Sequence, residues 1–136
     1  MYLLDTDILS NLAKRTPSTA LVAKLASVPR DAQFTSSITL GEMVYGAYRL
    51  REHTSLFLER LDRVLLPNLS VLPFDVAAAH RYGEVRAELE RRGTPLGEAD
   101  LRIGAIALSR GLTVVTGNVR HFQRIPDLTV ENWLEE

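Results

Sequence analysis

Residues 99–116 read ADLRIGAIALSRGLTVVT, a stretch in which a helical pattern passes directly into a strand pattern. In residues 99–110 the apolar side chains recur three or four positions apart, which is the spacing of a helix with one buried face. Gly111 stands where this helix is expected to end, because glycine adopts the left-handed conformation at little cost. Residues 112–116 are apolar and rich in β-branched side chains, as expected of a buried strand.

The rest of the chain repeats this alternation of helices and strands. We predict a helix from about Ile8, with Thr6 or Asp7 as its N-cap, and an edge or end position for the strand that contains Pro73. The pattern predicts an α/β fold, a three-layer α/β/α domain over residues 1–136 with a mainly parallel sheet of four to five strands. The other predicted helices cover 18–27, 39–50, 55–66 and 75–92, and the other strands cover 1–5, 33–36, 69–74 and 128–130.

The composition excludes several kinds of site and partner. The 136 residues contain no cysteine, so a disulfide, a zinc–thiolate site and a thiol nucleophile are excluded. The net charge is -1, whereas proteins that hold nucleic acid by bulk charge are basic. A polyanionic ligand would therefore need a bound cation or a local arginine patch. The N-terminus lacks a signal-peptide pattern, and no apolar run approaches the ~20 residues of a membrane helix, so we expect a cytoplasmic protein without a membrane partner.

Three acidic residues stand beside apolar ones, where a carboxylate is costly unless charge or hydrogen bonds compensate it. Asp5 ends the first strand, Glu42 lies at the edge of the apolar stripe of its helix, and Asp100 shares a helix face with Ile103 and Ala107. By position alone, helix capping explains Asp100 as well as a functional role does, whereas the helix after Asp5 has other residues available as caps. Together, three acids on separate elements indicate a hard-cation site with oxygen ligands.

Neighbouring residues add weaker signals. Gly41 and Gly46 lie in the same predicted helix as Glu42 and cost about 1 kcal/mol each relative to alanine, which predicts the close approach of another helix or of a ligand. Asn118 follows the strand at 112–116, where it is either a plain turn residue or part of a site at the carboxyl edge of the sheet. His121 lies just beyond and either approaches a substrate or faces solvent.

With these residues in place, the chain resembles the PIN-domain ribonucleases, and specifically the VapC-type toxins of bacterial toxin–antitoxin pairs. Three blocks carry the resemblance, and they follow one another in the family's order across residues 2–133. They are YLLDTDILS at 2–10, ITLGEMVYGA at 38–47 and GEADLRIGAIALSRGLTVVTGNVRHFQRIPDLTVENW at 97–133. The fold implied is a PIN-like α/β/α domain. Gly104 and Gly117 stand where alanine and asparagine are frequent in that family.

The resemblance assigns residues to roles. It implies that Asp5, Glu42 and Asp100 are the catalytic acids and bind Mg²⁺, with Mn²⁺ as a substitute. It also implies that Thr6, Thr116 and Asn118 support these acids or position the substrate. Asn118 matches the position where many relatives have a fourth aspartate, and an asparagine contributes no charge to a second metal site.

The function implied by the resemblance is that of a Mg²⁺- or Mn²⁺-dependent endoribonuclease acting as the toxin of a toxin–antitoxin pair. The partners implied are a VapB-type antitoxin, an RNA substrate such as a transfer RNA or another structured RNA, and a second copy of the chain in a homodimer. Operator DNA would be contacted only through the antitoxin.

Two alternatives remain open from the sequence. Asp5 and Asp7 after a strand also resemble the opening of haloacid-dehalogenase-type phosphatases, but that chemistry relies on a downstream lysine. Both lysines of this chain, Lys14 and Lys24, lie near its start. The other alternative is a catalytically silent relative that only binds its antitoxin or RNA, which metal-dependent cleavage would exclude.

Overall fold

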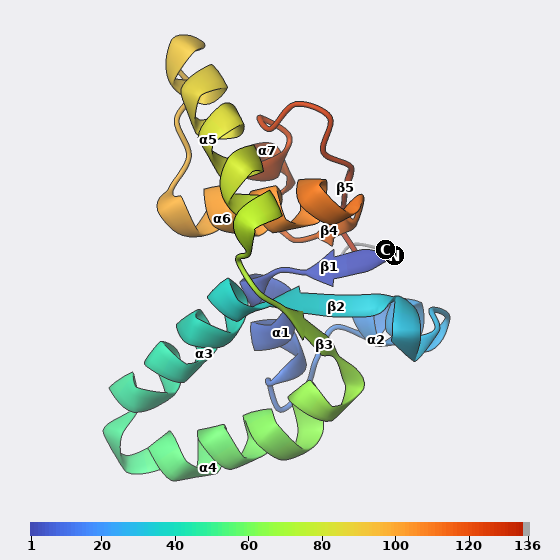
Figure 1. Cartoon of the computed structure of the whole chain (residues 1–136). Helices are drawn as coiled ribbons and strands as arrows, with labels where there is room; N and C mark the ends of the chain where they lie inside the picture. The colour runs from blue at the N-terminus through green and yellow to red at the C-terminus, as the bar shows by residue number, and fades with distance from the viewer. Residues whose placement is uncertain (135–136) are drawn as a thin grey trace.

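The computed structural model describes residues 1–134 and contains one five-stranded sheet in which every neighbouring pair of strands is parallel. The strand order is β3-β2-β1-β4-β5, so the first strand of the chain lies at the centre (Figure 1). The predicted α/β fold with a parallel sheet is confirmed. The strands are β1 (Tyr2–Leu4), β2 (Gln33–Ser36), β3 (Ser70–Leu72), β4 (Thr113–Val115) and β5 (Val130–Glu131).

Seven α-helices are found in residues 1–134, and they cover both faces of the sheet (Figure 1). Helices α5, α6 and α7 lie above the sheet in the view of Figure 1, and the first four lie below it. The third layer predicted from the alternation of elements is therefore present. The helices are α1 (Thr6–Leu12), α2 (Thr19–Ala26), α3 (Ser37–Arg49), α4 (Thr54–Arg60), α5 (Val76–Arg91), α6 (Glu98–Arg110) and α7 (Val119–Phe122).

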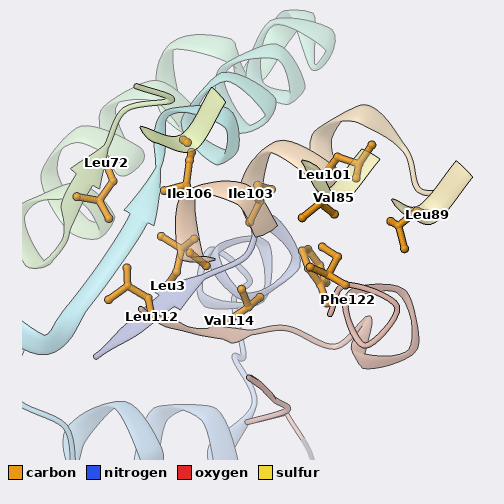
Figure 2. Packing of buried hydrophobic residues seen from close by; sticks show 13 residues of the cluster. Leu3, Leu72, Val85, Leu89, Leu101, Ile103, Ile106, Leu112, Val114 and Phe122 are labelled. Atoms are coloured by element: carbon orange, nitrogen blue, oxygen red, sulfur yellow. The ribbon is translucent and has the colours of Figure 1, made fainter. Parts of the chain in front are cut away.

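The alternation of side chains along the strands divides the core in two. Leu3 of β1 and Val114 of β4 point to the face covered by α5, α6 and α7, where they pack with residues such as Ile103 and Phe122 (Figure 2). Their neighbours in sequence, Leu4 and Val115, belong to the apolar cluster on the opposite face. Because successive strand residues point to opposite faces, a strand buried on both sides is a continuous apolar run, as residues 112–116 suggested.

Helix ends follow the sequence signals closely in several places. The side chain of Asp75 accepts a hydrogen bond from the backbone N–H of Ala78 at 2.9 Å and so begins α5 as predicted. Gly111 ends α6 with φ of 67°, the left-handed conformation that favours glycine. Strand β3 lies at the edge of the sheet, as Pro73 required.

Two expectations about the local structure are wrong. Helix α1 begins at Thr6 rather than Ile8, because the backbone of Asp5 is the N-cap and its carbonyl accepts from the N–H groups of Ile8 and Leu9. The helix predicted over 55–66 is α only to Arg60. A π turn, η3 (Leu61–Leu65), and a 3₁₀ turn, η4 (Leu66–Asn68), follow it. Pro67 has no backbone N–H to donate to a helical hydrogen bond, and the helix ends in the 3₁₀ turn that precedes β3.

The expected approach of another helix to the glycines of α3 is not found within residues 1–134, while the approach of a ligand stays a prediction. A Cβ atom built at Gly41 or Gly46 would meet no atom of residues 1–134 within 4 Å, so no packing contact in this part of the chain requires glycine there. Gly104 behaves in the opposite way, since a Cβ atom there would lie 2.4 Å from Cδ1 of the buried Ile125. Among residues 1–134, no helix has the length and apolar character to cross a membrane.

Candidate active site

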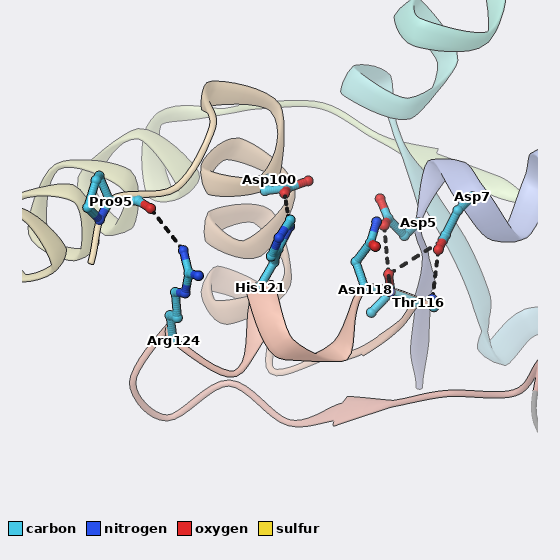
Figure 3. Close-up of polar contacts among 9 residues, drawn as sticks. Asp5, Asp7, Pro95, Asp100, Thr116, Asn118, His121 and Arg124 are labelled. Atoms are coloured by element: carbon cyan, nitrogen blue, oxygen red, sulfur yellow. Dashed lines mark hydrogen bonds and ion pairs between the residues drawn. The ribbon is translucent and has the colours of Figure 1, made fainter.

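The candidate site lies at the carboxyl ends of β1 and β4, where the chain continues from β1 to one side of the sheet and returns to the other. Ligands of open α/β sheets bind at such a reversal of strand order. Leu4 pairs with Val115 in the parallel register, so the residues that follow, Asp5 and Thr116, emerge side by side. Asp5 is only 4% exposed, and its Oδ2 accepts a hydrogen bond from the Thr116 hydroxyl at 2.8 Å (Figure 3).

The three acids predicted from the sequence line one open cavity of about 520 Å³. Asp5 reaches it from the end of β1, Glu42 from α3 and Asp100 from the first turn of α6. The Thr6 hydroxyl donates to Oε1 of Glu42 at 2.6 Å, which connects the start of α1 to α3. The other lining residues are Thr6, Asp7, Ser10, Asn11, Lys14, Asn118 and Leu134.

The carboxylates of this cavity repel one another. Burial, and then repulsion from Asp7, raise the pKa of Asp5 from 3.8 to about 7, although the hydrogen bond from Thr116 opposes the shift. Burial also raises the pKa of Asp100, with smaller contributions from Glu42 and Asp7, while the neighbouring His121 lowers it. The cavity thus concentrates negative charge that a bound cation would neutralise.

The donor set fits a hard divalent cation. Carboxylate and amide oxygens are the ligands that Mg²⁺ prefers, and the residues lining the cavity offer both. Within residues 1–134, no three acidic or histidine side chains already form a group that would surround an ion. Mg²⁺ usually keeps several waters and takes only one or two protein carboxylates, so a pair of acids with waters matches this arrangement.

The supporting residues predicted from the sequence occupy different positions around the cavity. Thr6 lines it and holds Glu42, whereas Thr116 is fully buried beneath it and holds Asp5. Asn118 lines the cavity, and its backbone N–H donates to the Thr116 hydroxyl oxygen at 2.9 Å. Thr6 and Thr116 thus each contact one of the acids, and Asn118 lines the cavity beside them.

Asp7, which the sequence indicated as a helix cap or as a partner of the acids, makes a contact that the sequence did not predict. Its Oδ2 accepts a hydrogen bond from the backbone N–H of Gly117 at 2.7 Å, across 110 positions of sequence (Figure 3). A Cβ atom at position 117 would lie 2.7 Å from this same oxygen, which explains the glycine there. Only the pairing of β1 with β4 brings the two residues together, so no local pattern indicates the contact.

His121 approaches the site from α7. Its Nδ1 lies 3.5 Å from Oδ2 of Asp100, and about half of its side-chain surface is exposed (Figure 3). The imidazole therefore faces solvent, as one of the two possibilities for His121 predicted, and it also contacts Asp100. Arg124, one turn further, donates to the backbone carbonyl of Pro95 at 3.1 Å and ties this segment to the loop before α6.

Comparison with known proteins agrees with this geometry. The family model described as the PIN domain matches residues 2–128. The "tRNA(fMet)-specific endonuclease VapC" of Salmonella typhimurium is 48% identical over 101 residues, which cover 72% of this chain and 73% of that protein. The protein of the same name from Shigella flexneri is 37% identical over 134 residues and 97% of each chain.

Solved structures give the same result. The FitAcB structure from Neisseria gonorrhoeae is similar with a TM-score of 0.91 and 31% identity, over 100% of both chains. The structure of VapBC2 from Rickettsia felis, bound to a DNA fragment of its promoter, has a TM-score of 0.89 and 32% identity and covers 97% of this chain and 98% of that one. These matches leave the phosphatase alternative without support. The chain belongs to the PIN domain family, in its branch of VapC-type toxin ribonucleases.

Proposed function

We propose that Asp5, Glu42 and Asp100 form the cation-dependent catalytic centre with which this VapC-type ribonuclease hydrolyses RNA. The observation that carries the proposal is their convergence on one open cavity from three separate elements, at the carboxyl edge of the sheet. The raised pKa of Asp5 supports it, because perturbed carboxyl groups in a cleft are typical of functional sites.

Asp5 and Asp100 would hold the cation, directly or through water. Bound Mg²⁺ or Mn²⁺ would neutralise charge on the phosphate and lower the pKa of a coordinated water. Thr116 keeps the carboxylate of Asp5 in one orientation through its 2.8 Å hydrogen bond. The cation held by this acidic pair would supply the positive field at the phosphate that a chain of net charge -1 does not supply by itself.

Glu42 would act on the attacking water. The carboxylate is exposed, and one of its oxygens is fixed by the Thr6 hydroxyl at 2.6 Å. The second oxygen can accept the proton of a water directed at the phosphorus. Asn118 would position that water or a phosphate oxygen through its amide. Because an amide brings no charge, we propose that a single tightly held cation is sufficient for this site.

The comparisons suggest substrate and partners. Two relatives are named for cleavage of tRNA(fMet), and we propose a transfer RNA, with the initiator first, as the substrate. Similar structures are described as VapBC assemblies, one of them with promoter DNA. We therefore propose a VapB-type antitoxin as partner, a homodimer of this chain as the functional unit, operator DNA contacted through the antitoxin, and action in the cytoplasm.

The test is RNA cleavage by purified, antitoxin-free protein spanning residues 1–136. A total RNA pool and initiator tRNA are incubated with Mg²⁺, with Mn²⁺ and with EDTA, and the fragment ends are mapped. Asp100→Asn removes one acid of the cavity, and Glu84→Gln is the matched control in an exposed ion pair on α5. Discrete fragments that need a divalent cation and disappear only with Asp100→Asn support the proposal.

Cleavage that survives EDTA or Asp100→Asn would overturn it. A folded protein that binds RNA or antitoxin but cleaves nothing with either cation would instead support the catalytically silent relative.

A further inference from the structure

We propose that Asp7 is a positioning residue of this site. Its carboxylate holds residues 116–118 against the start of α1, and this contact, called the clamp below, orients Thr116 and Asn118 toward the catalytic acids. The inference rests on the proposed function, because Asp7 acts through Asp5 and its neighbours. Asp7 lies in the first turn of α1, three residues beyond the end of β1, and lines the same cavity.

The contact with Gly117 is the centre of the argument. The Gly117 N–H donates to Oδ2 of Asp7 at 2.7 Å, a short distance for a hydrogen bond between a backbone amide and a carboxylate. The N-cap of α1 is Asp5, and the Asp7 carboxylate is directed across to the segment that follows β4. It therefore fastens two segments that are 110 positions apart in sequence.

The clamp transmits its effect through Thr116. The Thr116 hydroxyl donates its single proton to Asp5 at 2.8 Å, while Oδ1 of Asp7 lies further away at 3.4 Å. The same hydroxyl oxygen accepts from the N–H of Asn118 at 2.9 Å. A shift of the Gly117 backbone would thus move the partner of Asp5 and the side chain of Asn118 together.

Gly117 leaves room for the Asp7 carboxylate because it has no side chain. Its φ lies outside the left-handed region, so the backbone conformation does not itself require glycine. A Cβ atom there would instead lie 2.7 Å from Oδ2 of Asp7 and 3.0 Å from Cδ1 of Leu134. Asp7 and Gly117 therefore form a matched pair, in which the absent side chain of one makes room for the carboxylate of the other.

A helix-stabilising role makes a different prediction. An acidic residue in the first turn of a helix stabilises it through the helix dipole, and its loss would lower stability without changing turnover. If Asp7 acts as a clamp, its loss should lower kcat at nearly constant KM. The catalytic acids would be displaced, while most contacts with the RNA would be kept. The clamp also predicts that asparagine replaces Asp7 well, since an amide oxygen accepts from Gly117 as a carboxylate does.

The experiment compares Asp7→Ala, Asp7→Asn, Gly117→Ala and the double variant Asp7→Ala/Gly117→Ala. The substrate is an RNA oligonucleotide that spans a mapped cleavage site, and kcat, KM and the melting temperature are measured for full-length, antitoxin-free protein. Amide hydrogen exchange at Gly117 gives a readout independent of activity. Asp31→Ala, at an exposed aspartate outside the cavity, is the matched control.

We expect Asp7→Ala to lower kcat roughly tenfold to a hundredfold, the order of loss that small misplacements in active sites produce. The same variant should speed exchange at Gly117, while Asp7→Asn stays close to the parent protein. Gly117→Ala should also lower kcat, and in the Asp7→Ala background it should add little, because both changes break one contact.

An unchanged kcat in Asp7→Ala, or an equal loss in Asp7→Asn and Asp7→Ala, would overturn the clamp. If Asp7→Ala does not fold, Asp7→Asn and Gly117→Ala still decide the matter, since the first should retain turnover and the second should lose it. Asp100→Asn separates the two proposals. If that variant still cleaves, the proposed function fails; if it is inactive while Asp7→Ala is fully active, only the clamp fails.

Discussion

Replacement of Asp5 by asparagine should make the cation-free protein more stable and insensitive to Mg²⁺. The pKa of Asp5 is raised from 3.8 to about 7, chiefly by burial and by repulsion from Asp7. Because each pKa unit corresponds to 1.36 kcal/mol, ionising this carboxyl in the folded state costs about 4 kcal/mol. That is a large part of the 5–15 kcal/mol by which proteins are typically stable.

The sign follows from proton binding. Between about pH 4 and pH 7 the folded protein holds a proton on Asp5 that the unfolded chain has lost, so stability falls as the pH rises through this window. Above it the full cost is present, and a cation that binds the folded state offsets it. Asparagine carries no charge and can still accept the hydrogen bond of Thr116, so Asp5→Asn should show a flatter profile and higher stability at pH 8.

The assay is urea unfolding at pH 5 and pH 8, with EDTA and with Mg²⁺, for the parent protein and Asp5→Asn. Asp31→Asn, at an exposed position, is the control and should follow the parent protein. We expect the variant to exceed the parent by up to about 4 kcal/mol at pH 8 in EDTA and to gain nothing from Mg²⁺. Equal stability of the two at pH 8, or a parent protein as stable at pH 8 as at pH 5, would refute the reasoning.

Three further changes test the surroundings of the site. Thr116→Val removes the hydrogen bond that lowers the pKa of Asp5, and it should cost about 1–3 kcal/mol in urea unfolding and lower kcat in the cleavage assay. His121→Ala removes the group that lowers the pKa of Asp100, so the acid limb of the pH–rate profile should move to higher pH; an unmoved limb would contradict this. Gly46→Ala adds a methyl group on α3 where no atom lies within 4 Å, and because alanine favours the helix it should stabilise the protein by about 0.5–1 kcal/mol in thermal unfolding. A loss of stability would mean that position 46 requires glycine.

Local patterns were sufficient for much of the fold. The strand predicted at 33–36 is β2 at the same bounds, and the cap at Asp75 and the stop at Gly111 lie where capping chemistry placed them. These features depend on contacts between residues a few positions apart. The π turn after Arg60 was missed because the apolar spacing of residues 55–66 fits an α-helix and does not indicate a change of helix type.

The site was predictable only in part, because several of its contacts join residues far apart in the sequence. Asp5, Glu42 and Asp100 stand out because each lies beside apolar residues, and the family resemblance assigned them a common role. The resemblance also indicated Thr6 and Thr116 as supporting residues, but which acid each one contacts follows only from the packing of the elements. The sequence indicated Asp7 as a helix cap or as a partner of the acids, but its contact with Gly117 becomes visible only when β1 pairs with β4.

The central position of β1 has a consequence for the timing of synthesis. Residues 5–7 leave the ribosome about 110 residues before residues 116–118. The hydrogen bonds of Asp5 and Asp7 join these two segments. At 5–20 residues per second, the first half of the site waits roughly 5 to 20 s for the second. During that interval the nascent chain has acidic residues without the sheet that gathers them. If the three acids act as proposed, the nascent chain has no complete site until Asp100 and residues 116–118 have been added.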